Sequence, residues 1–531
     1  MHTRSIAIVL AALAPVAGGH AQEPPQSLVV DPQQGATPRP IENPPTPQPD
    51  LVIETPAPAP VTAPATPIAP LQPPPPIRFE RPDVSLQTPQ SALPPPSEDP
   101  LALDRASDPV LALAESTANP AKFADAIRSA VEQHPMLVEV RADRDEAVAI
   151  RNEARALVWP VADVSLSYFK VVDRDFSNDP QNILERSRPG ERTDALLRLN
   201  APLIDFGRGQ ARIRSANERI SAADASIGDS ALRLAQASIA AWYQVFTYRA
   251  LVRLGEAFVA NQDELRDALQ TRIEQGASAP TDIAQYDSYR ASAQSQLADF
   301  RRQLSTAEAQ YRSYIGESPP ADLGRAPAAE TLGITADALA TSIENLPSVE
   351  RARRLAHAAE FDAKATRALE LPSVSVGLDA GRYGVFENDR DYDIRASVTL
   401  SQRFFGGAKQ RTDQAEARER QALAAYDRTR IEAQRDAEIA LADVQALGDS
   451  TTALRENYFA SRQSRDALFE RFRFARGTLY DVLTAQTNYF NVAVRFLAAV
   501  SELDIARYNL LAKTGRLLDS LDINPSEAPR K

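Results

Sequence analysis

The sequence predicts a mainly helical protein with two pairs of membrane-type β-strands, built from one unit that occurs twice. Three observations predict this. Two long stretches lack proline and have the spacing of packed helices. Four short stretches alternate apolar and polar residues, and landmarks in one half of the body recur in the other. The chain has 531 residues, 43% of them hydrophobic, so it is long enough to bury such a core.

The first 21 residues have the composition of a secretory signal peptide. Arg4 gives a positive start, residues 6–16 form a short apolar run, and Gly19 and Ala21 are small residues at the positions expected for cleavage. Because a signal peptide directs export, we expect an exported chain. The alternative interpretation of these residues is a buried N-terminal helix. No later apolar run reaches the length of a membrane-spanning helix, so any membrane span should be built from strands.

Charge and cysteine content exclude several other classes of function. The net charge is −12, which disfavours a nucleic-acid-binding surface. The chain has no cysteine, which excludes disulfides, thiolate metal sites and a lipid-anchored N-terminal cysteine.

Residues 22–118 are expected to form a proline-rich, disordered arm. Of the 41 prolines, 25 lie between residues 22 and 100. Proline removes amide donors and fixes φ, so such a segment should form neither ladders nor helices. The simplest interpretation is a linker without a specific partner. The alternative is a segment that binds another periplasmic component or the cell wall.

The body of the chain shows an internal duplication. A Phe-Gly junction and a later break that ends in Asp are 76 residues apart in both halves, from Phe206 to Asp282 and from Phe405 to Asp481. Such repetition indicates two copies of one structural unit. We predict a first copy at 119–316, a linker at 317–336, a second copy at 337–520 and a C-terminal tail at 521–531.

Each copy begins with a helix that ends at a proline and continues into two predicted strands. Val164, Leu166 and Tyr168, for example, alternate with polar residues. This pattern is typical of transmembrane strands with lipid on one side and water on the other, although a half-buried soluble sheet shares it. The four strands are expected at about 161–171, 193–204, 373–383 and 392–404.

A long helical hairpin follows each strand pair. Residues 210–275 contain no proline, and large and small residues recur at heptad spacing, as at Ile213 and Ala216. The segment GASAPTD, at 276–282, should turn the chain back, because Gly276 and Pro280 are turn formers and Asp282 can cap the returning helix. The segment ARGTLYD, at 475–481, should do the same in the second copy.

Four strands cannot close a barrel alone, because open edges are costly in lipid. Closure therefore needs several chains, and three copies would supply twelve strands. The residues themselves leave the number of copies open.

The ordered set of duplicated landmarks resembles the TolC family of outer-membrane channel proteins over residues 121–520. The segment LYDVLTAQTNYFNV, at 479–492, is similar to the family's second tip motif. The resemblance implies a homotrimer in the outer membrane, with a twelve-stranded β-barrel continued by an α-helical barrel across the periplasm. It also implies docking of the helical tips to a periplasmic adaptor (membrane fusion) protein that is joined to an inner-membrane pump.

The resemblance also implies a pore constriction at the tips. Asp481 matches the first acid of the family's acidic ring, while the place of a second acid is taken by Thr484. Asp282 matches an acid that helps to hold the closed state, and Arg476 lies one position from a basic partner. The alternative is that both aspartates only cap helices. The tip turns implied in adaptor docking comprise Gly276, Ala277, Ser278, Ala475, Gly477 and Thr478.

Other chemistry has little support in the sequence. His134 and His357 lack acidic or cysteine neighbours at ligand spacing, and the lone G-x-G of FGRGQ follows a strand without a nucleotide-binding unit. We therefore expect no enzyme activity, no cofactor and no metal. The expected function is a passive outer-membrane exit duct of a tripartite export system, for efflux of drugs or metals or for type I secretion of protein. The alternatives are a periplasmic coiled-coil adaptor or scaffold and a passive porin.

Overall fold

The computed structural model describes residues 92–97, 99–100, 105–175, 181, 183, 187–331, 333–387, 391–402, 404–474 and 476–525. These belong to the unit formed by residues 84–531. The expected signal peptide, residues 22–91 of the expected arm, Ala475 and the last six residues of the tail lie outside the described residues.

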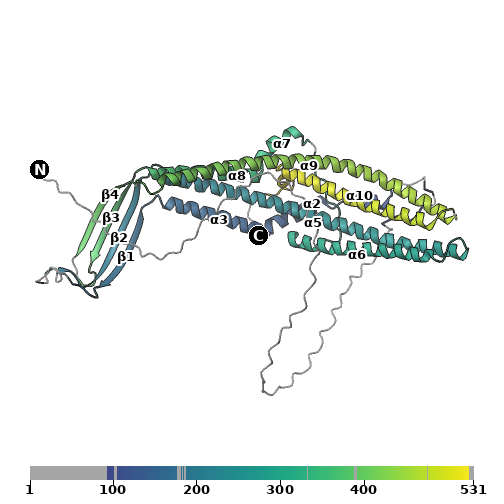
Figure 1. Ribbon diagram of the computed structural model, residues 1–531, viewed down its shortest axis with the longest axis horizontal. Coiled ribbons are helices and arrows are strands. Elements are labelled where there is room, and N and C mark those ends of the chain that lie inside the picture. Colours follow the sequence, from purple (N-terminus) through teal and green to yellow (C-terminus); the bar gives the residue numbers. More distant parts are fainter. Residues whose placement is uncertain are drawn as a thin grey trace, which may run out of the picture. The chain divides into compact units, whose positions relative to one another are not determined.

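Four antiparallel strands form one sheet in the order β1–β2–β3–β4 (Figure 1). Their register places apolar residues opposite one another: Val164 faces Leu197, and Leu378 faces both Leu199 and Ala396. Because successive side chains in a strand point to opposite sides, this register gathers the apolar residues on one face. The strands are β1 (Val161–Lys170), β2 (Glu191–Ile204), β3 (Ser373–Tyr383) and β4 (Tyr392–Ser401).

The opposite face of the sheet is polar. Asp163, Arg198, Asp379 and Arg395 lie directly opposite one another across the four strands, so the signs of charge alternate along this row. Arg198 and Asp379 form an ion pair of 3.9 Å. Opposite charges at facing positions support this register, since a slip of one residue would move the row to the apolar face.

Each strand pair continues into a very long helix that pairs with a shorter returning one (Figure 1). Helix α5 has 67 residues and α9 has 66, so each extends for about 100 Å at 1.5 Å per residue. The chain enters them through Phe206 and Phe405, which have positive φ, each followed by a glycine that also has positive φ. The four helices are α5 (Arg208–Glu274), α6 (Asp282–Ile315), α9 (Ala408–Arg473) and α10 (Leu479–Lys513).

Shorter helices pack alongside these four. Helix α8 contacts both α5 and α9, and α3 contacts α5. Prolines occupy the first position of α2, α3 and α8, where the missing amide hydrogen bond costs nothing. Their bounds are α1 (Pro109–Glu115), α2 (Pro120–Gln133), α3 (Pro135–Ala156), α7 (Ala336–Ser342), α8 (Pro347–Arg367) and α11 (Leu517–Ser520), with short 3₁₀ turns at Ile343–Asn345 and Ala368–Glu370.

The end of the expected proline-rich arm is ordered, contrary to the expectation that disorder extends to residue 118. Leu93 is buried, and Asp108 caps helix α1, which buries Val110, Leu111 and Ala114. The physical reason is a change of composition after residue 100, where prolines become rare and apolar residues recur at helical spacing around an N-cap aspartate.

The described residues form three buried apolar clusters among the helices. The first surrounds Trp242, whose ring meets Phe123 edge-on at 5.3 Å. The second contains Phe258 stacked on Phe490 at 4.1 Å, and the third lies beneath the two tips. Among the described helices, none is both long enough and apolar enough to cross a membrane.

Candidate functional site

The first tip is a helix C-cap followed at once by a new helix start. Gly276 has φ of +72°, and the amide of Ala277 donates to the carbonyl of Arg272 at 2.8 Å. This left-handed cap favours glycine, because a side chain there meets its own backbone. At the start of α6, the carboxylate of Asp282 accepts a hydrogen bond of 3.2 Å from the amide of Ala279.

The second tip repeats this geometry. The amide of Arg476 donates to the carbonyl of Arg471 at 2.9 Å, which mirrors the first tip at an offset of 199 residues. Helix α10 then begins with a reciprocal capping box. Asp481 accepts from the amide of Thr478 at 3.3 Å and from its hydroxyl at 2.6 Å, while the amide of Asp481 donates to that hydroxyl at 3.2 Å.

These contacts place the two predicted acids. Asp481 is exposed and Asp282 is half-buried. Hydrogen bonds from Thr478, with a smaller contribution from the positive charge of Arg471, lower the pKa of Asp481 below its ordinary value of 3.8. Asp481 therefore belongs to the capping box of α10 and also presents its negative charge to solvent, whereas Asp282 accepts from Ala279 in the turn that precedes α6.

The predicted docking residues divide between exposed and internal positions. Gly276, Ala277, Thr478 and the basic residue Arg476 are exposed, whereas Ser278 and Gly477 are half-buried, and Ala475 lies outside the described residues. A side chain at Gly477 would place its Cβ 3.3 Å from the amide nitrogen of Phe472. The backbone at Gly477 therefore packs closely against the end of α9 and does not form an open surface.

Arg272, which the sequence analysis did not identify, joins the two tips. Its guanidinium donates to Ser278 Oγ at 3.2 Å and to the carbonyl of Ala277 at 3.1 Å, and it also donates to the carbonyl of Phe472 at the end of α9. The guanidinium lies 4.2 Å from the centre of the Phe472 ring. One side chain thus closes the first turn and holds it against the second. The sequence signal that could have identified Arg272 is the 199-residue offset between the two copies, which places Arg272 at the position of Arg471.

A buried cluster beneath the tips holds the four helix ends together. Tyr286 is fully buried and donates its hydroxyl to the carbonyl of Gln262 at 2.9 Å. The side chain of Gln262 donates to Gln486 at 3.2 Å, which links α5 to α10. The cluster, which we call the tip cluster, consists of Leu265, Leu269, Tyr286, Phe469, Phe472, Leu479, Val482 and Leu483.

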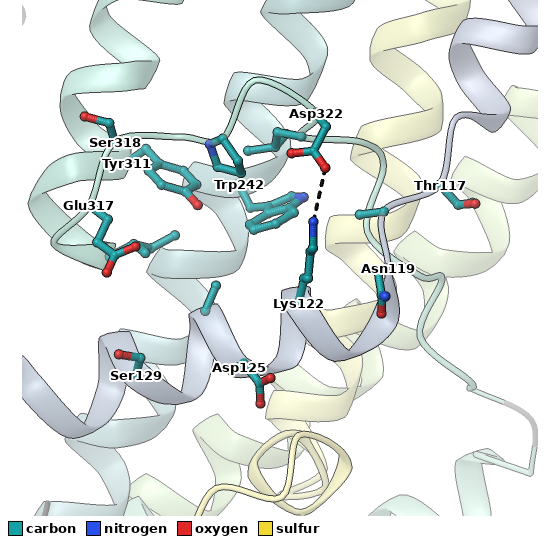
Figure 2. Close-up of a pocket in the computed structure, with 15 residues that line it drawn as sticks. Thr117, Asn119, Lys122, Asp125, Ser129, Trp242, Tyr311, Glu317, Ser318 and Asp322 are labelled. Atoms are coloured by element: carbon teal, nitrogen blue, oxygen red, sulfur yellow. Dashed lines mark hydrogen bonds and ion pairs between the residues drawn. The ribbon is translucent and has the colours of Figure 1, made fainter. Parts of the chain in front are cut away.

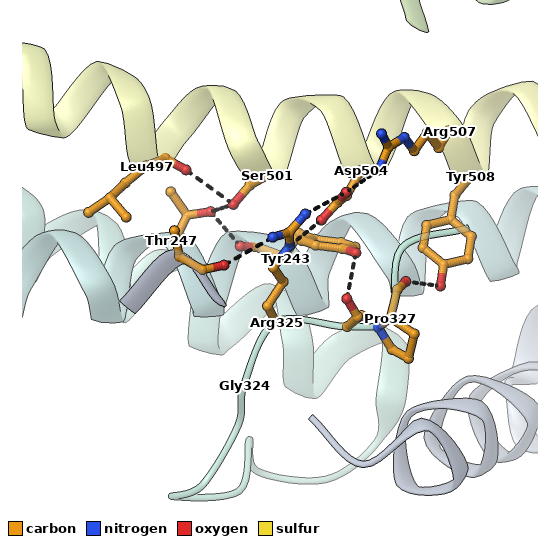
Figure 3. Close-up of polar contacts among 12 residues, drawn as sticks. Tyr243, Thr247, Gly324, Arg325, Pro327, Leu497, Ser501, Asp504, Arg507 and Tyr508 are labelled. Atoms are coloured by element: carbon orange, nitrogen blue, oxygen red, sulfur yellow. Dashed lines mark hydrogen bonds and ion pairs between the residues drawn. The ribbon is translucent and has the colours of Figure 1, made fainter. Parts of the chain in front are cut away.

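A second polar assembly fixes the linker between the two copies to the helices (Figure 3). Arg325 makes a two-pronged ion pair with Asp504, at 2.6 and 3.0 Å, and donates to the carbonyl of Ala114 at 3.1 Å. Tyr243 and Tyr508 donate to carbonyls of the same linker segment. The middle of the predicted linker is therefore bound to α5, α10 and α1.

A groove of about 480 Å³ lies beside this linker (Figure 2). Lys122 and Asp322 line this groove and form an ion pair of 3.2 Å, and each of their side chains is at least two-thirds exposed. The groove is also lined by the buried ring of Trp242. Within the described ranges, no group of three or more His, Asp or Glu side chains could hold a metal ion.

Strand pairs that feed paired long helices, with capped turns at the far ends of those helices, define the class of outer-membrane export channels. The family model of the outer membrane efflux proteins matches residues 126–317 and 338–516. The chain belongs to the outer membrane efflux protein family and is an efflux channel of the outer membrane.

Individual relatives are more distant. The outer membrane efflux protein BepC of Brucella suis is 25% identical over 341 residues, which cover 60% of this chain and 72% of BepC. The pyoverdine export outer membrane protein OpmQ of Pseudomonas aeruginosa is 24% identical over 325 residues, covering 58% and 67%. The crystal structure of VceC from Vibrio cholerae shares the fold with a TM-score of 0.64 at 19% identity, covering 74% of this chain and 96% of VceC.

Proposed function

We propose that three copies of this chain assemble in the outer membrane and close a twelve-stranded barrel that the long helices continue as a duct through the periplasm. One observation carries the proposal: a four-stranded antiparallel sheet with β1 and β4 at its edges, each pair continuing into a helix of about 100 Å. Unpaired strand edges are costly in lipid, and pairing β4 of one copy with β1 of the next removes them.

The two edges are suited to each other. They are antiparallel within the sheet, since each strand reverses the direction of the last, and an even number of strands keeps this alternation around a closed ring. At the level of the charged row, β1 carries Asp163 and β4 carries Arg395, so the edge strands bear opposite charges. The apolar face would meet lipid and the polar face the lumen.

Cysteine cross-linking tests this assembly without background, because the chain has no cysteine. A fixed cysteine at Ala396 on β4 is combined in turn with cysteines at Ala162, Val164, Leu166 and Tyr168 on β1, all on the apolar face. We expect covalent trimers from the one or two combinations that match the register between subunits. The pair Leu199→Cys and Leu378→Cys, which face each other within one chain, should give no covalent trimer. Monomers from every edge combination would contradict the proposal.

We propose further that the tips form the periplasmic constriction and dock a periplasmic adaptor joined to an inner-membrane pump. The repeated turns expose Gly276, Ala277 and Thr478 at the ends of the helical hairpins, far from the sheet along the chain. Asp481 faces solvent with a lowered pKa, so three copies would place three negative charges around one axis. Such a ring would favour cations over anions.

Two substitutions at Asp481 separate charge from capping. Asp481→Asn removes the charge and keeps an acceptor oxygen for Thr478, while Asp481→Ala removes both. Single-channel recordings in planar bilayers measure the ratio of cation to anion permeability. We expect both variants to lose cation preference, and Asp282→Asn shows whether the acid of the first tip contributes to it as well. A preference that is unchanged in Asp481→Asn would show that this side chain only caps the helix.

For the cargo, we propose small molecules rather than protein. This rests on relatives that are named for efflux and for pyoverdine export. A deletion strain should accumulate small toxic compounds and regain export when the intact chain is supplied. Loss of a secreted protein together with unchanged drug sensitivity would contradict this choice.

A further inference from the structure

The described part of residues 92–118, here called the N-terminal strap, lies against α5 of the first copy, where Asn261 donates to the carbonyl of Leu93 at 3.1 Å, and against α9 and α10 of the second copy. Leu93, Val110, Leu111 and Ala114 belong to the buried cluster that contains Phe490 and Phe496. Only parts of this segment are described, at 92–97, 99–100 and 105–118. Buried polar contacts, rather than apolar packing alone, fix it in place.

Asp108 makes the central contact of the strap. It caps α1 by accepting from the amide of Val110 at 2.9 Å. Its carboxylate also accepts from Arg462 at 2.6 Å and from the hydroxyl of Tyr458 at 2.9 Å, and that hydroxyl lies 2.9 Å from the hydroxyl of Tyr489. The side chain of Asp108 is fully buried and that of Arg462 is 11% exposed. The carboxylate thus connects the strap to both α9 and α10.

A second buried contact lies one turn further along α9. Arg465 donates to the carbonyls of Pro94 and Pro95, at 3.0 and 3.4 Å, and pairs with Asp466 at 2.5 Å. The guanidinium also lies 4.5 Å from the centre of the Tyr489 ring. Arg465 is 3% exposed with the strap in place, so departure of the strap would leave Asp466 as the ion-pair partner of this charge.

The first copy lacks this binding site although its helices are otherwise equivalent. At the 199-residue offset, Tyr458 corresponds to Val259, Arg462 to Asp263 and Tyr489 to Arg290. Asp263 and Arg290 form an ion pair of 3.5 Å, and their side chains are 64% and 36% exposed. The buried polar site is therefore a specialisation of the second copy and not a by-product of the duplicated packing.

The strap site is continuous with the tip along α9. Phe469 and Phe472 follow Asp466 within the next two turns and belong to the tip cluster. Phe472 in turn receives the hydrogen bond from Arg272 of the first tip. Any displacement of α9 at Arg462 and Arg465 therefore acts on the helix segment that supports both tips.

We propose that the N-terminal strap is an intramolecular latch whose docking on α9 and α10 holds the second helical hairpin, and with it the tip, in the conformation described here. Release of the strap frees this part of α9 and lets the tip open. The proposal rests on the proposed role of the tips as the constriction. It gives the end of the proline-rich segment a regulatory role in place of that of a passive linker.

The test compares a buried and an exposed contact of the same strap with the same helix. Asp108→Ala removes the buried contact, while Glu456→Gln weakens the exposed pair of Arg105 and Glu456, whose side chains are 60% and 62% exposed. Full-length protein in detergent is followed by backbone hydrogen exchange over 455–473, and the same samples are recorded in planar bilayers. For Asp108→Ala we expect exchange at least about a hundredfold faster, because breaking a buried ion pair leaves a charge unpaired. Open time should rise at least about tenfold.

The control should change exchange by less than about fivefold, as for an exposed ion pair. Unchanged exchange in Asp108→Ala would overturn the docking, and faster exchange with unchanged open time would overturn the latch. If Asp108→Ala does not assemble, Tyr458→Phe removes one hydroxyl and should accelerate exchange by about fivefold to tenfold, with the same two readouts. Failure of the proposed function has a different signature: wild-type protein would form no pores, whatever the exchange shows.

Discussion

Removal of the Arg325 side chain should destabilise the junction of the two copies strongly. Arg325 binds Asp504 through two hydrogen bonds, and the Asp504 side chain is fully buried (Figure 3). In Arg325→Met, the carboxylate keeps the charge of Arg507 at 3.3 Å, whose side chain is 30% exposed. Breaking a buried ion pair costs about 3–5 kcal/mol, and the remaining partner places this variant near the lower end, about 3 kcal/mol. The carbonyl of Ala114 also loses its donor.

Hydrogen exchange of the backbone around 504–511 measures this cost, and about 3 kcal/mol corresponds to roughly hundredfold faster exchange. Lys122→Ala is the matched control, because the Lys122–Asp322 pair is more than two-thirds exposed and should be worth at most about 1 kcal/mol. The double variant Arg325→Met with Asp504→Leu should lose less than the single variant, because no charge is left buried. Equal effects of Arg325→Met and Lys122→Ala would refute this reasoning.

Four further predictions concern stability. Gly324→Ala should destabilise the linker by about 1–3 kcal/mol in thermal unfolding, because its Cβ would lie 2.9 Å from backbone atoms of the N-terminal strap. By contrast, Gly448→Ala should stabilise α9 by up to about 1 kcal/mol, since its Cβ meets nothing within 4 Å. Phe490→Ala should cost about 3–5 kcal/mol in the same measurement, since the ring is 1% exposed and stacks on Phe258. The hydrogen bonds that lower the pKa of Asp481 stabilise the tip above pH 3.8, and this contribution should disappear as the pH falls through the lower folded pKa, seen as faster exchange at residues 478–484.

The features that a local pattern determines were accessible from the sequence. The alternation at Val164, Leu166 and Tyr168 lies in β1, which ends at Lys170, one residue before the expected boundary. The absence of proline in 210–275 matches a helix that begins at Arg208 and ends at Glu274. Period and proline content act within a few residues, so they can be read without knowledge of the fold.

Contacts between distant segments were not accessible in this way. Arg325 lies 179 residues from Asp504, and Asp108 lies 354 residues from Arg462, so no spacing rule relates them. The proline content of residues 22–100 also obscured the short apolar run that follows. The contact of Arg272 with Phe472 was missed as well, although the common offset relates Arg272 itself to Arg471.

The duplication explains both what the two tips share and where they differ. Both turns share two hydrogen bonds. The carbonyl of Arg272 or Arg471 accepts from the amide five residues on, and the carboxylate of Asp282 or Asp481 accepts from the amide three residues before it. Capping fixes the orientation of a carboxylate without removing its charge, so a role at the helix start and a role toward the pore are compatible in Asp481. Polar groups in the helix interior are not constrained by the turn, and there the second copy has acquired the site that binds the N-terminal strap. If this division holds, exchanging the tip segments 276–282 and 475–481 between copies should preserve assembly, whereas exchanging 458–466 for 259–267 should release the strap.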